Sequence, residues 1–581
     1  MINRKKQKYS ISLVTVLMIS LLGVTLCTNF YDLNDQIKFG NEYDNKLLKM
    51  ASIYQDLIID DNGAQDWDWA KSSGICTGFG TPASPYRILD GIFEYLLNPD
   101  GHCLQIFNSR KYFILRNCTF QDADMTGAGL YMNNVTNGLI DDCFSVNNLY
   151  SNCIGIFMEN VNNTQIRDSY ISENDGDGIY MIDSHFNTIR YNNISANEYR
   201  GLYLSQSTHN TISNNEINDN QNADGILMDT NSDDNTISTN TINSNGVNGI
   251  QIDSCNRNTI SNNDANSNGQ HGIFVFGGIR NTINLNTAND NGGMGINIAL
   301  GSDWNTVSRN TANSNDNNGI YCVFSDYNEI FQNVANDNLG IGLYEGFGFH
   351  NIIHKNTLYN NTVDGIFIAL GNNITCTQNT VYENKNNGIY HSVMTDSLIE
   401  DNNVHHNGMH GILLDGGSVR NIIKDNSFNY NNMSGVNFAA NSDDNLLINN
   451  IASNNVDHGI SLVSSDNNII SDNTASNNGQ NGINLLTSQD NTIISNVANN
   501  NINGTYLVSS NNNKIISNIL LGNIVCYNET GSTGNIFEAN VCTGTGGFAF
   551  DLSIFLLILV IIESVALAVI LSTYFIRKRK S

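Results

Sequence analysis

The chain has 581 residues, with 27 Lys and Arg against 55 Asp and Glu, and its formal net charge is −28. A surface this acidic repels the phosphate backbone of nucleic acids, which excludes them as expected partners. Only three prolines occur, Pro82, Pro85 and Pro99. Because proline cannot donate a ladder hydrogen bond, its absence from the remaining chain suits continuous β-sheet.

An apolar segment follows the basic sequence RKKQK and runs from Ile11 to about Leu26. It predicts a secretory signal peptide or an uncleaved signal-anchor within residues 1–29. We expect residues 30–105 to form an N-terminal cap that covers the open edge of the first coil of the domain that follows. Either N-terminal alternative leaves the bulk of the chain outside the cytoplasm.

Residues 106–545 repeat a pattern every 22 to 25 residues, as NGQHGIFVFGGIRNTINLN (268–286) and NGQNGINLLTSQDNTIISN (478–496) illustrate. Each unit holds three short stretches in which apolar residues alternate, which is the spacing of strands and not of helices. Three short strands with turns between them describe one coil of a right-handed parallel β-helix. The sequence therefore predicts an all-β solenoid of about 18 coils.

Asparagines recur at two fixed positions of the unit, in one row from Asn192 to Asn540 and another from Asn148 to Asn523. A side-chain amide both donates and accepts, so stacked copies can hydrogen-bond along the solenoid axis. We interpret both rows as structural ladders at two corners of the coil. Cys118 and Cys143 occupy the first row's position in earlier coils, as a disulfide or as two small buried thiols.

The unit N-x-I-x-x-N … N-x-x-G-I-x-(I/L) resembles the β-helix repeats of the copper-accessory NosD family and of the wider pectate-lyase-like superfamily. The segments Gly78–Phe93 and Phe107–Phe120 resemble the beginning and the first coil of such a helix. The resemblance implies extracytoplasmic work on polymers, or adhesion to them, and carries over no catalytic residue. A NosD-like metal-accessory role and a structural adhesin or spacer stay open as alternatives.

The second residue after the repeated glycine is expected to face outward from one strand of every coil. An outward aromatic row is a candidate platform for sugar rings, although aromatic side chains also suit any strand surface. The favoured function is thus non-catalytic binding of polysaccharide or another surface glycan. The expected ligand-binding residues are Tyr131, Phe157, Tyr180, Tyr203, Phe274, Tyr321, Tyr344, Phe367 and Tyr390.

Acidic residues flank this row, and they are weak candidates for catalysis. Paired carboxylates about 5 Å apart can act on a glycosidic bond, as in a polysaccharide lyase or glycoside hydrolase, and can also hold Ca²⁺. Solvated turn residues are the competing interpretation, and no Arg or Lys is evident beside an acid pair. The candidates are Glu159, Asp175, Asp177, Asp183, Asp229 and Asp253.

Four histidines cluster in the sequence, His391, His405, His406 and His410. Neutral imidazole is a good ligand for copper or zinc. Adjacent residues of an extended segment point apart, so only some of the four can converge. His405, His406 and His410 are weak metal candidates, and no resident cofactor is expected.

A second apolar segment runs from Leu552 to Ile576 and ends at the basic sequence RKRK. Its length predicts a transmembrane helix within residues 546–576. The basic residues assign the tail, residues 577–581, to the cytoplasm. We therefore expect a cell-membrane protein, single-pass or double-pass, whose bulk is extracytoplasmic.

Overall fold

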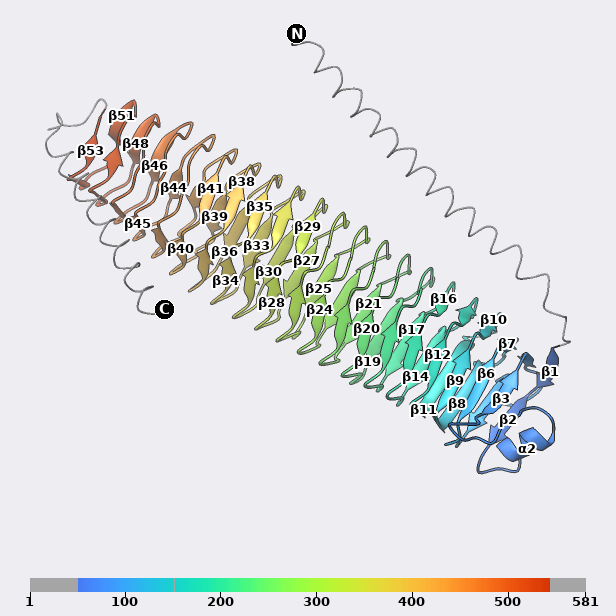
Figure 1. Cartoon of the computed structure of the whole chain (residues 1–581). Coiled ribbons are helices and arrows are strands. Elements are labelled where there is room, and N and C mark those ends of the chain that lie inside the picture. The colour runs from blue at the N-terminus through green and yellow to red at the C-terminus, as the bar shows by residue number, and fades with distance from the viewer. Residues whose placement is uncertain (1–50, 151, 544–581) are drawn as a thin grey trace, which may run out of the picture. The chain divides into compact units, whose positions relative to one another are not determined.

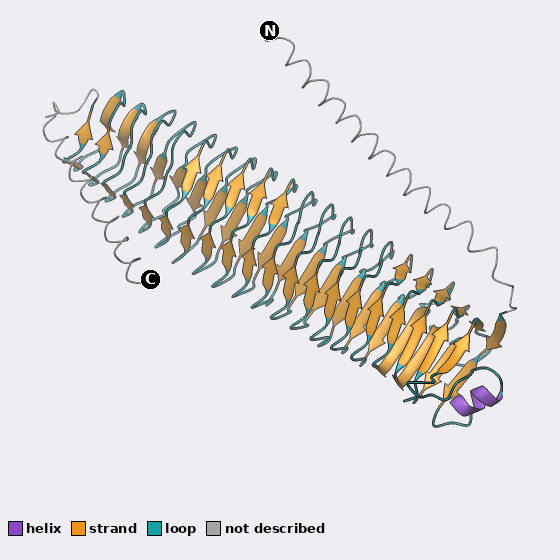
Figure 2. Cartoon of the chain, in the orientation of Figure 1, coloured by secondary structure: helices purple, strands orange, loops and turns teal. Residues whose placement is uncertain are grey.

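The computed structural model describes residues 51–150 and 152–543, which wind into one parallel β-solenoid (Figure 1). The solenoid belongs to a compact unit that begins at Ile53. Three short strands per coil add to three sheets that run along the solenoid, as the orange arrows of Figure 2 show. The right-handed all-β solenoid predicted from the repeat is confirmed, with about 20 coils in place of about 18.

The first sheet is a continuous parallel ladder in which each strand pairs with the equivalent strand of the next coil, for example Tyr180 with Tyr203. Its strands are β2 (Leu57–Asp60), β5 (Leu104–Phe107), β8 (Ala128–Thr136), β11 (Ile154–Asn162), β14 (Ile179–Ile182), β17 (Leu202–Ser205), β19 (Ile226–Asp229), β21 (Ile250–Asp253), β23 (Ile273–Phe276), β25 (Ile296–Ala299), β27 (Ile320–Val323), β30 (Leu343–Gly346), β33 (Ile366–Ala369), β36 (Ile389–Ser392), β39 (Ile412–Asp415), β42 (Val436–Phe438), β44 (Ile460–Val463), β46 (Asn481–Leu486), β48 (Asn503–Val508) and β51 (Val525–Thr530).

The second sheet follows the same rule, and its central isoleucines, such as Ile212 and Ile237, pair in register and are fully buried. Its strands are β3 (Tyr86–Leu89), β6 (Phe113–Arg116), β9 (Gly138–Asp141), β12 (Gln165–Arg167), β15 (Thr188–Arg190), β18 (Thr211–Ser213), β20 (Thr236–Ser238), β22 (Thr259–Ser261), β24 (Thr282–Asn284), β26 (Thr306–Ser308), β28 (Glu329–Phe331), β31 (Ile352–His354), β34 (Thr375–Thr377), β37 (Leu398–Glu400), β40 (Ile422–Lys424), β43 (Leu446–Ile448), β45 (Ile469–Ser471), β47 (Thr492–Ile494), β49 (Lys514–Ile516) and β52 (Ile536–Glu538).

The third sheet is interrupted, and single bridges such as Asn193 to Glu216 and Thr311 to Val334 carry its register through coils without strands. Its strands are β1 (Ser52–Gln55), β4 (Gly91–Glu94), β7 (Thr119–Gln121), β10 (Phe144–Val146), β13 (Tyr170–Ser172), β16 (Asn193–Ser195), β29 (Val334–Asn336), β32 (Thr357–Tyr359), β35 (Thr380–Tyr382), β38 (Asn403–His405), β41 (Ser427–Asn429), β50 (Ile519–Leu520) and β53 (Val541–Cys542).

The first coil does not follow the repeat period, because it carries an insertion that contains the helix α2 (Trp67–Ser72). Leu57 pairs with Leu104, a separation far beyond the period of the other coils. The buried Trp67 stacks on Tyr86, with ring centroids 5.1 Å apart, and covers the core at this end. Strand pairing therefore starts within the segment that was expected to form the cap.

Both expected asparagine ladders are present. In the first, Asn215 Nδ2 donates to Asn240 Oδ1 at 3.0 Å and to the Ile189 carbonyl at 2.9 Å. The backbone N–H of Asn215 donates to the same Asn240 oxygen at 2.9 Å, so each amide serves two neighbouring coils. In the second ladder, Asn174 Nδ2 donates to Asn197 Oδ1 at 2.8 Å. Stacked amides thus satisfy the buried polar groups of the turns.

The asparagine that begins each repeat unit forms a third ladder, which was not predicted. Asn210 Nδ2 donates to Asn235 Oδ1 at 3.1 Å, and Asn421 Nδ2 donates to Asn445 Oδ1 at 3.1 Å. The "NTI" asparagine is therefore a third corner of hydrogen-bonded amides.

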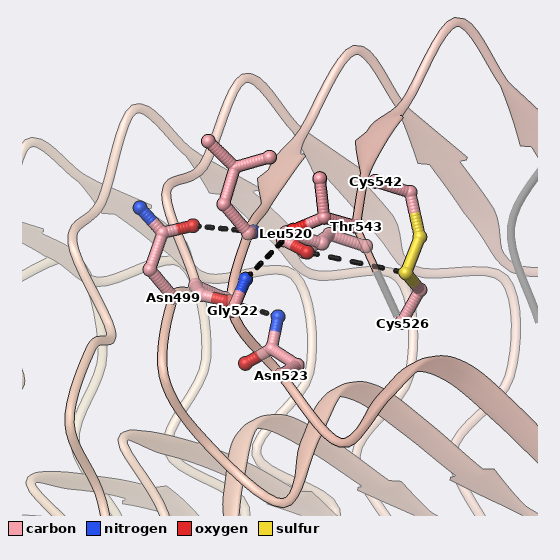
Figure 3. Close-up of a disulfide and its surroundings, with 9 residues drawn as sticks. Asn499, Leu520, Gly522, Asn523, Cys526, Cys542 and Thr543 are labelled. Atoms are coloured by element: carbon pink, nitrogen blue, oxygen red, sulfur yellow. Dashed lines mark hydrogen bonds between the residues drawn. A yellow bond between two sulfur atoms is a disulfide. The ribbon is translucent and has the colours of Figure 1, made fainter. Parts of the chain in front are cut away.

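The cysteines behave in two ways. Cys118 and Cys143 are buried free thiols, and their Sγ atoms donate to the Ile88 and Leu115 carbonyls. Cys526 and Cys542 instead form a disulfide inside the last coil, between β51 and β53 (Figure 3). This bond ties the first and third sheets together at the C-terminal end of the solenoid.

Within residues 51–150 and 152–543, no helix has the length and apolar character needed to cross a membrane. The two apolar segments, Ile11–Leu26 and Leu552–Ile576, lie outside the described residues. The predicted signal segment, transmembrane helix and cytoplasmic tail therefore lie outside them as well.

Candidate ligand-binding face

The expected aromatic row lies in register on the outer face of the first sheet. Phe157 pairs with Tyr131 on one side and with Tyr180 on the other, and Tyr180 pairs with Tyr203. All four side chains are partly exposed. Strand alternation therefore brings together residues that are more than twenty positions apart in the sequence.

A second run on the same face consists of Tyr321, Tyr344, Phe367 and Tyr390, again in register. Phe274 stands between the two runs, with Gln251 and Asn297 as its cross-strand neighbours, so it has no aromatic partner in the row. The row of nine expected ligand-binding residues is thus two aromatic blocks and the ring of Phe274, which contacts His271 and Phe276 edge-on.

In the first block the rings stack on one another. The centroids of Phe157 and Tyr180 are 5.0 Å apart with an interplanar angle of 9°, and those of Tyr180 and Tyr203 are 4.6 Å apart at 7°. Parallel rings stacked along the axis turn their faces toward each other. They offer solvent their edges and hydroxyl groups, together with whatever parts of the ring faces the offset leaves open.

The hydroxyl groups of this block meet carboxylates of the following coils. Tyr131 Oη donates to Glu159 Oε2, and Asn133 Nδ2 donates to the same oxygen at 2.6 Å. Burial and this hydrogen bond raise the pKa of Tyr131 to about 12. The phenol therefore stays protonated at neutral pH and acts as a donor.

A second cluster surrounds Tyr203. Its hydroxyl donates to Asp229 Oδ2 at 2.8 Å, and the Arg200 guanidinium lies over its ring, 4.3 Å from the centroid. Arg200 also approaches Asp177 at 3.5 Å. Burial raises the pKa of Asp177 and outweighs the opposing effect of Arg200. No basic residue was expected beside an acid pair, and pairing between coils places Arg200 beside one acid, Asp177.

The remaining acids are less connected. Asp175 accepts the Asn152 backbone N–H at 2.7 Å, as a turn residue does, and Asp183 is exposed. Asp253 occupies the position of Asp229 one coil later, because the preceding residues Met228 and Ile252 pair with each other. Glu159, Asp177 and Asp229 therefore contact the aromatic block or its arginine, whereas Asp175 and Asp183 do not.

The position before the repeated glycine, which Asp177 and His410 occupy in their coils, carries Asp224, Asn248 and His271 in others, and these three were not predicted as site residues. Asp224 Oδ1 accepts the Asn248 backbone N–H at 2.9 Å, and Asn248 Oδ1 accepts that of His271 at 3.0 Å. Burial lowers the pKa of His271 to about 4, which keeps its imidazole neutral. The sequence signal was weak, since this position changes chemistry from coil to coil and only its acceptor role persists.

The fold separates His391 and His410 from the adjacent pair His405 and His406. His391 points into the core and is fully buried. His410 lies in the turn before β39, where its Nδ1 accepts the Ser434 backbone N–H at 3.2 Å. His405 and His406 lie together at the end of β38. Within the described part of the chain, no group of three or more His, Cys, Asp or Glu side chains is assembled to hold a metal ion.

Comparisons with known proteins agree with this architecture. The family model described as "Right handed beta helix region" matches residues 154–312, 299–395 and 391–520, which together exceed half of the chain. No curated protein matches the sequence.

Three solved structures share part of the fold. The DFA-IIIase from Arthrobacter chlorophenolicus A6 without its lid is 13% identical, with a TM-score of 0.29. The match covers 40% of this chain and 65% of that enzyme. Pectate lyase Pel9A is 14% identical, with a TM-score of 0.31 over 45% of this chain and 76% of its own. The A-module of the Azotobacter vinelandii mannuronan C-5 epimerase AlgE4 is 13% identical, with a TM-score of 0.25. The match covers 83% of this chain and 93% of that module. At this similarity they assign no activity.

Proposed function

The chain belongs to the right-handed β-helix family, and from that premise we propose that the outer face of its first sheet binds a polysaccharide between Tyr131 and Asp229. The single observation that supports this is the aromatic block with its hydroxyl, carboxylate and guanidinium groups, in which Tyr131 comes from one coil and Arg200 and Tyr203 come from another. Sugars need this combination, because they present both hydroxyl groups and apolar ring faces.

The charge of the face narrows the ligand class. The face carries the acids Glu159, Asp177 and Asp229 and the cation Arg200, which pairs with Asp177, on a chain of net charge −28. An anionic polymer would be repelled along most of the solenoid. We therefore assign the face to a neutral glycan, whose hydroxyl groups donate to the carboxylate and phenol oxygens and accept from Arg200.

A glycan-array screen followed by affinity measurement tests this proposal. Tyr203→Ala removes one ring of the stack and one donor, so we expect binding to weaken at least tenfold. Tyr382→Ala is the matched control, because Tyr382 stacks on Tyr359 with centroids 4.9 Å apart on a different sheet. Equal retention of the glycan by parent and Tyr203→Ala would reject the face, and absence of any glycan ligand would favour a structural spacer.

The cluster of Tyr203, Arg200, Asp177 and Asp229 also supports a second candidate, a glycan-cleaving enzyme. Burial and the hydrogen bond to Asp229 raise the pKa of Tyr203, so its phenol is a poor base at neutral pH. This disfavours a lyase that uses the phenolate. A hydrolase that uses carboxylates fits the cluster better, and release of reducing ends from a neutral glycan, abolished in Asp229→Asn, is its test.

We further propose that the solenoid works outside the cytoplasm, held by the segment Leu552–Ile576. The Cys526–Cys542 disulfide supports this, because such bonds persist mainly in oxidising compartments. Protease treatment of intact cells should digest the solenoid, whereas a cytoplasmic location would protect it.

A further inference from the structure

A column of exposed apolar residues runs along the corner where the coils leave the first sheet. Its members directly follow the last residues of strands in that sheet, and those last residues, such as Ala299 and Val323, pair in register. The two coils before the column hold Ser254 and Gly277 at this position, and the coil after it holds Gly416. The column itself spans five successive coils, with Leu300, Phe324, Phe347, Leu370 and Val393.

The backbone at this position is left-handed, which makes large apolar residues unexpected there. The φ angle is 53° at Leu300 and 55° at Val393. Glycine, asparagine and aspartate adopt this conformation at the lowest cost, whereas bulky and β-branched residues are disfavoured in it. The rings of Phe324 and Phe347 stack with centroids 4.4 Å apart, yet both stay exposed. The column thus opposes both the backbone preference and the hydrophobic effect, which indicates a surface that another molecule covers.

Aromatic side chains widen the column on both sides. Toward the second sheet, the exposed rings of Trp304 and Tyr327 stack with centroids 4.3 Å apart, and exposed Phe349 lies in the same turn of the next coil. Toward the first sheet, a Cβ atom on Gly346 would lie 2.6 Å from Cε1 of Tyr344, so the Tyr344 ring extends over the strand end beside the column. We call the five column residues together with Trp304, Tyr327 and Phe349 the corner patch.

The area of the corner patch suits a protein partner. Its eight side chains are 39% to 52% exposed, which amounts to roughly 700 Å² if each offers about 150–250 Å² when fully exposed. The largest apolar patch of a typical monomer covers about 300–600 Å², and a stable complex buries about 800 Å² on each partner. A second copy of this chain carries an apolar surface of matching size. We propose that the corner patch is a dimer interface, covered by the corner patch of a second copy.

Charged residues stand at the two ends of the patch. Arg280 takes the place of Trp304 one coil earlier, because its N–H donates to the carbonyl of the preceding residue, Asp303, at 3.1 Å. Arg280 is exposed and forms no ion pair among the described residues. Asp396 takes the same place at the other end of the column, with a φ of 52°. It binds Arg420 of its own chain at 2.8 Å, and each of its oxygens can accept a further hydrogen bond.

This charge pattern favours an antiparallel arrangement of the two solenoids. A twofold axis that lies in the interface, between the coils of Phe324 and Phe347, places Phe324 on Phe347 of the second copy. The same axis places Arg280 opposite Asp396 of the second copy, so opposite charges meet at both ends. A parallel arrangement would instead place equal coils opposite each other, and residues 277–281 of the Arg280 coil include no acid.

Site-specific photo-crosslinking of the full chain, in the cells that express it, tests the proposal. p-Benzoylphenylalanine placed at Phe347 should give an adduct of twice the mass of the chain, with the crosslink at Phe324 of the second copy. Trp304→Asn/Phe324→Asn should lower the yield about tenfold or more, and asparagine suits the left-handed backbone at both positions. The same probe at Phe186 is the matched control, because Phe186 is exposed with a φ of 58° outside the corner patch.

Circular dichroism verifies that the variants fold. Failure of the probe at Phe347 to give the double-mass adduct, or its attachment only to a different protein, would overturn the second copy as the partner. A crosslink from Phe347 to its own equivalent would overturn the antiparallel arrangement. Arg280→Glu should lower the yield severalfold and Arg309→Glu, at an exposed turn after the second sheet, should not; equal yields would also speak against that arrangement. None of these results bears on the glycan-binding face, which lies in earlier coils.

Discussion

The carboxyl group of Glu345 lies inside the solenoid, in a column of the first sheet that is otherwise mostly aliphatic. It is fully buried, with Cys322 and Ile368 as its cross-strand neighbours. Its Oε1 accepts from Asn351 Nδ2 at 2.8 Å, and its Oε2 has no hydrogen-bond partner among the described residues. Burial raises the pKa of Glu345 from the ordinary 4.5 to about 8.

This shift makes stability depend on pH. Between about 4.5 and about 8 the folded chain keeps a proton on Glu345 that the unfolded chain has lost, so the free energy of unfolding falls as pH rises. The stabilisation is complete below the unfolded pKa and is lost as pH passes the folded one. The difference of 3.5 pKa units corresponds to about 5 kcal/mol in total, of which the interval from pH 6.5 to 8 carries about 2 kcal/mol.

The interval above pH 6.5 isolates Glu345 from His391. Burial lowers the pKa of His391 from 6.5 to about 3, so its contribution has the opposite sign and is lost only as pH falls below 6.5. Urea denaturation at pH 6.5 and pH 8, with the midpoint measured by both unfolding and refolding, gives the change in the free energy of unfolding with pH. In Glu345→Gln the amide is neutral throughout, and we expect the decline of about 2 kcal/mol to vanish.

Exposed Glu173 provides the control, and Glu173→Gln should keep the slope of the parent. Hydrogen exchange of β30 at the two pH values shows whether the effect is local. An identical loss of stability in the parent and in Glu345→Gln would refute the reasoning.

Three further predictions concern the ladder, the disulfide and the glycan-binding face. Asn263→Ala removes an amide that accepts from Asn240 at 3.0 Å and donates to the Ile237 carbonyl at 2.9 Å, so the urea midpoint should fall by an amount equivalent to about 1–3 kcal/mol; an unchanged midpoint would contradict the ladder's role. Reduction of Cys526–Cys542, which closes a separation of 16 residues, should destabilise the last coil by about 3 kcal/mol and expose it to protease; equal digestion rates with and without reductant would argue against this. Tyr203→Phe keeps the ring stack and removes the donor to Asp229, so we expect a severalfold loss of glycan affinity in the array assay, and an unchanged affinity would show that the phenol is not used.

Sequence periodicity predicted the solenoid because every coil obeys the same local rule. Alternation fixed which residues face inward, and the register of equivalent positions followed, as the pairing of Phe157 with Tyr180 shows. The first coil escaped because the insertion with α2 breaks the period. The burial of Glu345 and His391 was not predicted either, although the same alternation that turns Tyr344 and Tyr390 outward turns these two residues inward.

The candidate sites were predicted less completely than the fold, for a physical reason. The repeat determines where a Cα lies and to which side its side chain points, but it does not determine where the end of a long side chain reaches. Arg200 occupies the repeat position of Asp177 one coil later, so the register makes them neighbours, but it does not predict that the guanidinium lies over the ring of Tyr203. The hydrogen bond between the rings of His405 and His406 depends instead on His406, a left-handed residue at the end of a strand.

The division between inward and outward columns explains where function is found on such a chain. Inward side chains and ladder asparagines stabilise the coil. An ionisable side chain at an inward position, such as Glu345, therefore lowers stability in a definable pH range. Outward side chains do not stabilise the coil in this way. When the same kind of unusual outward side chain recurs in several successive coils, its presence needs another explanation. The stacked block from Tyr131 to Tyr203 is such a case on the first sheet. The apolar column from Leu300 to Val393 is another, at the corner that follows the first sheet, so one solenoid offers two chemically distinct surfaces.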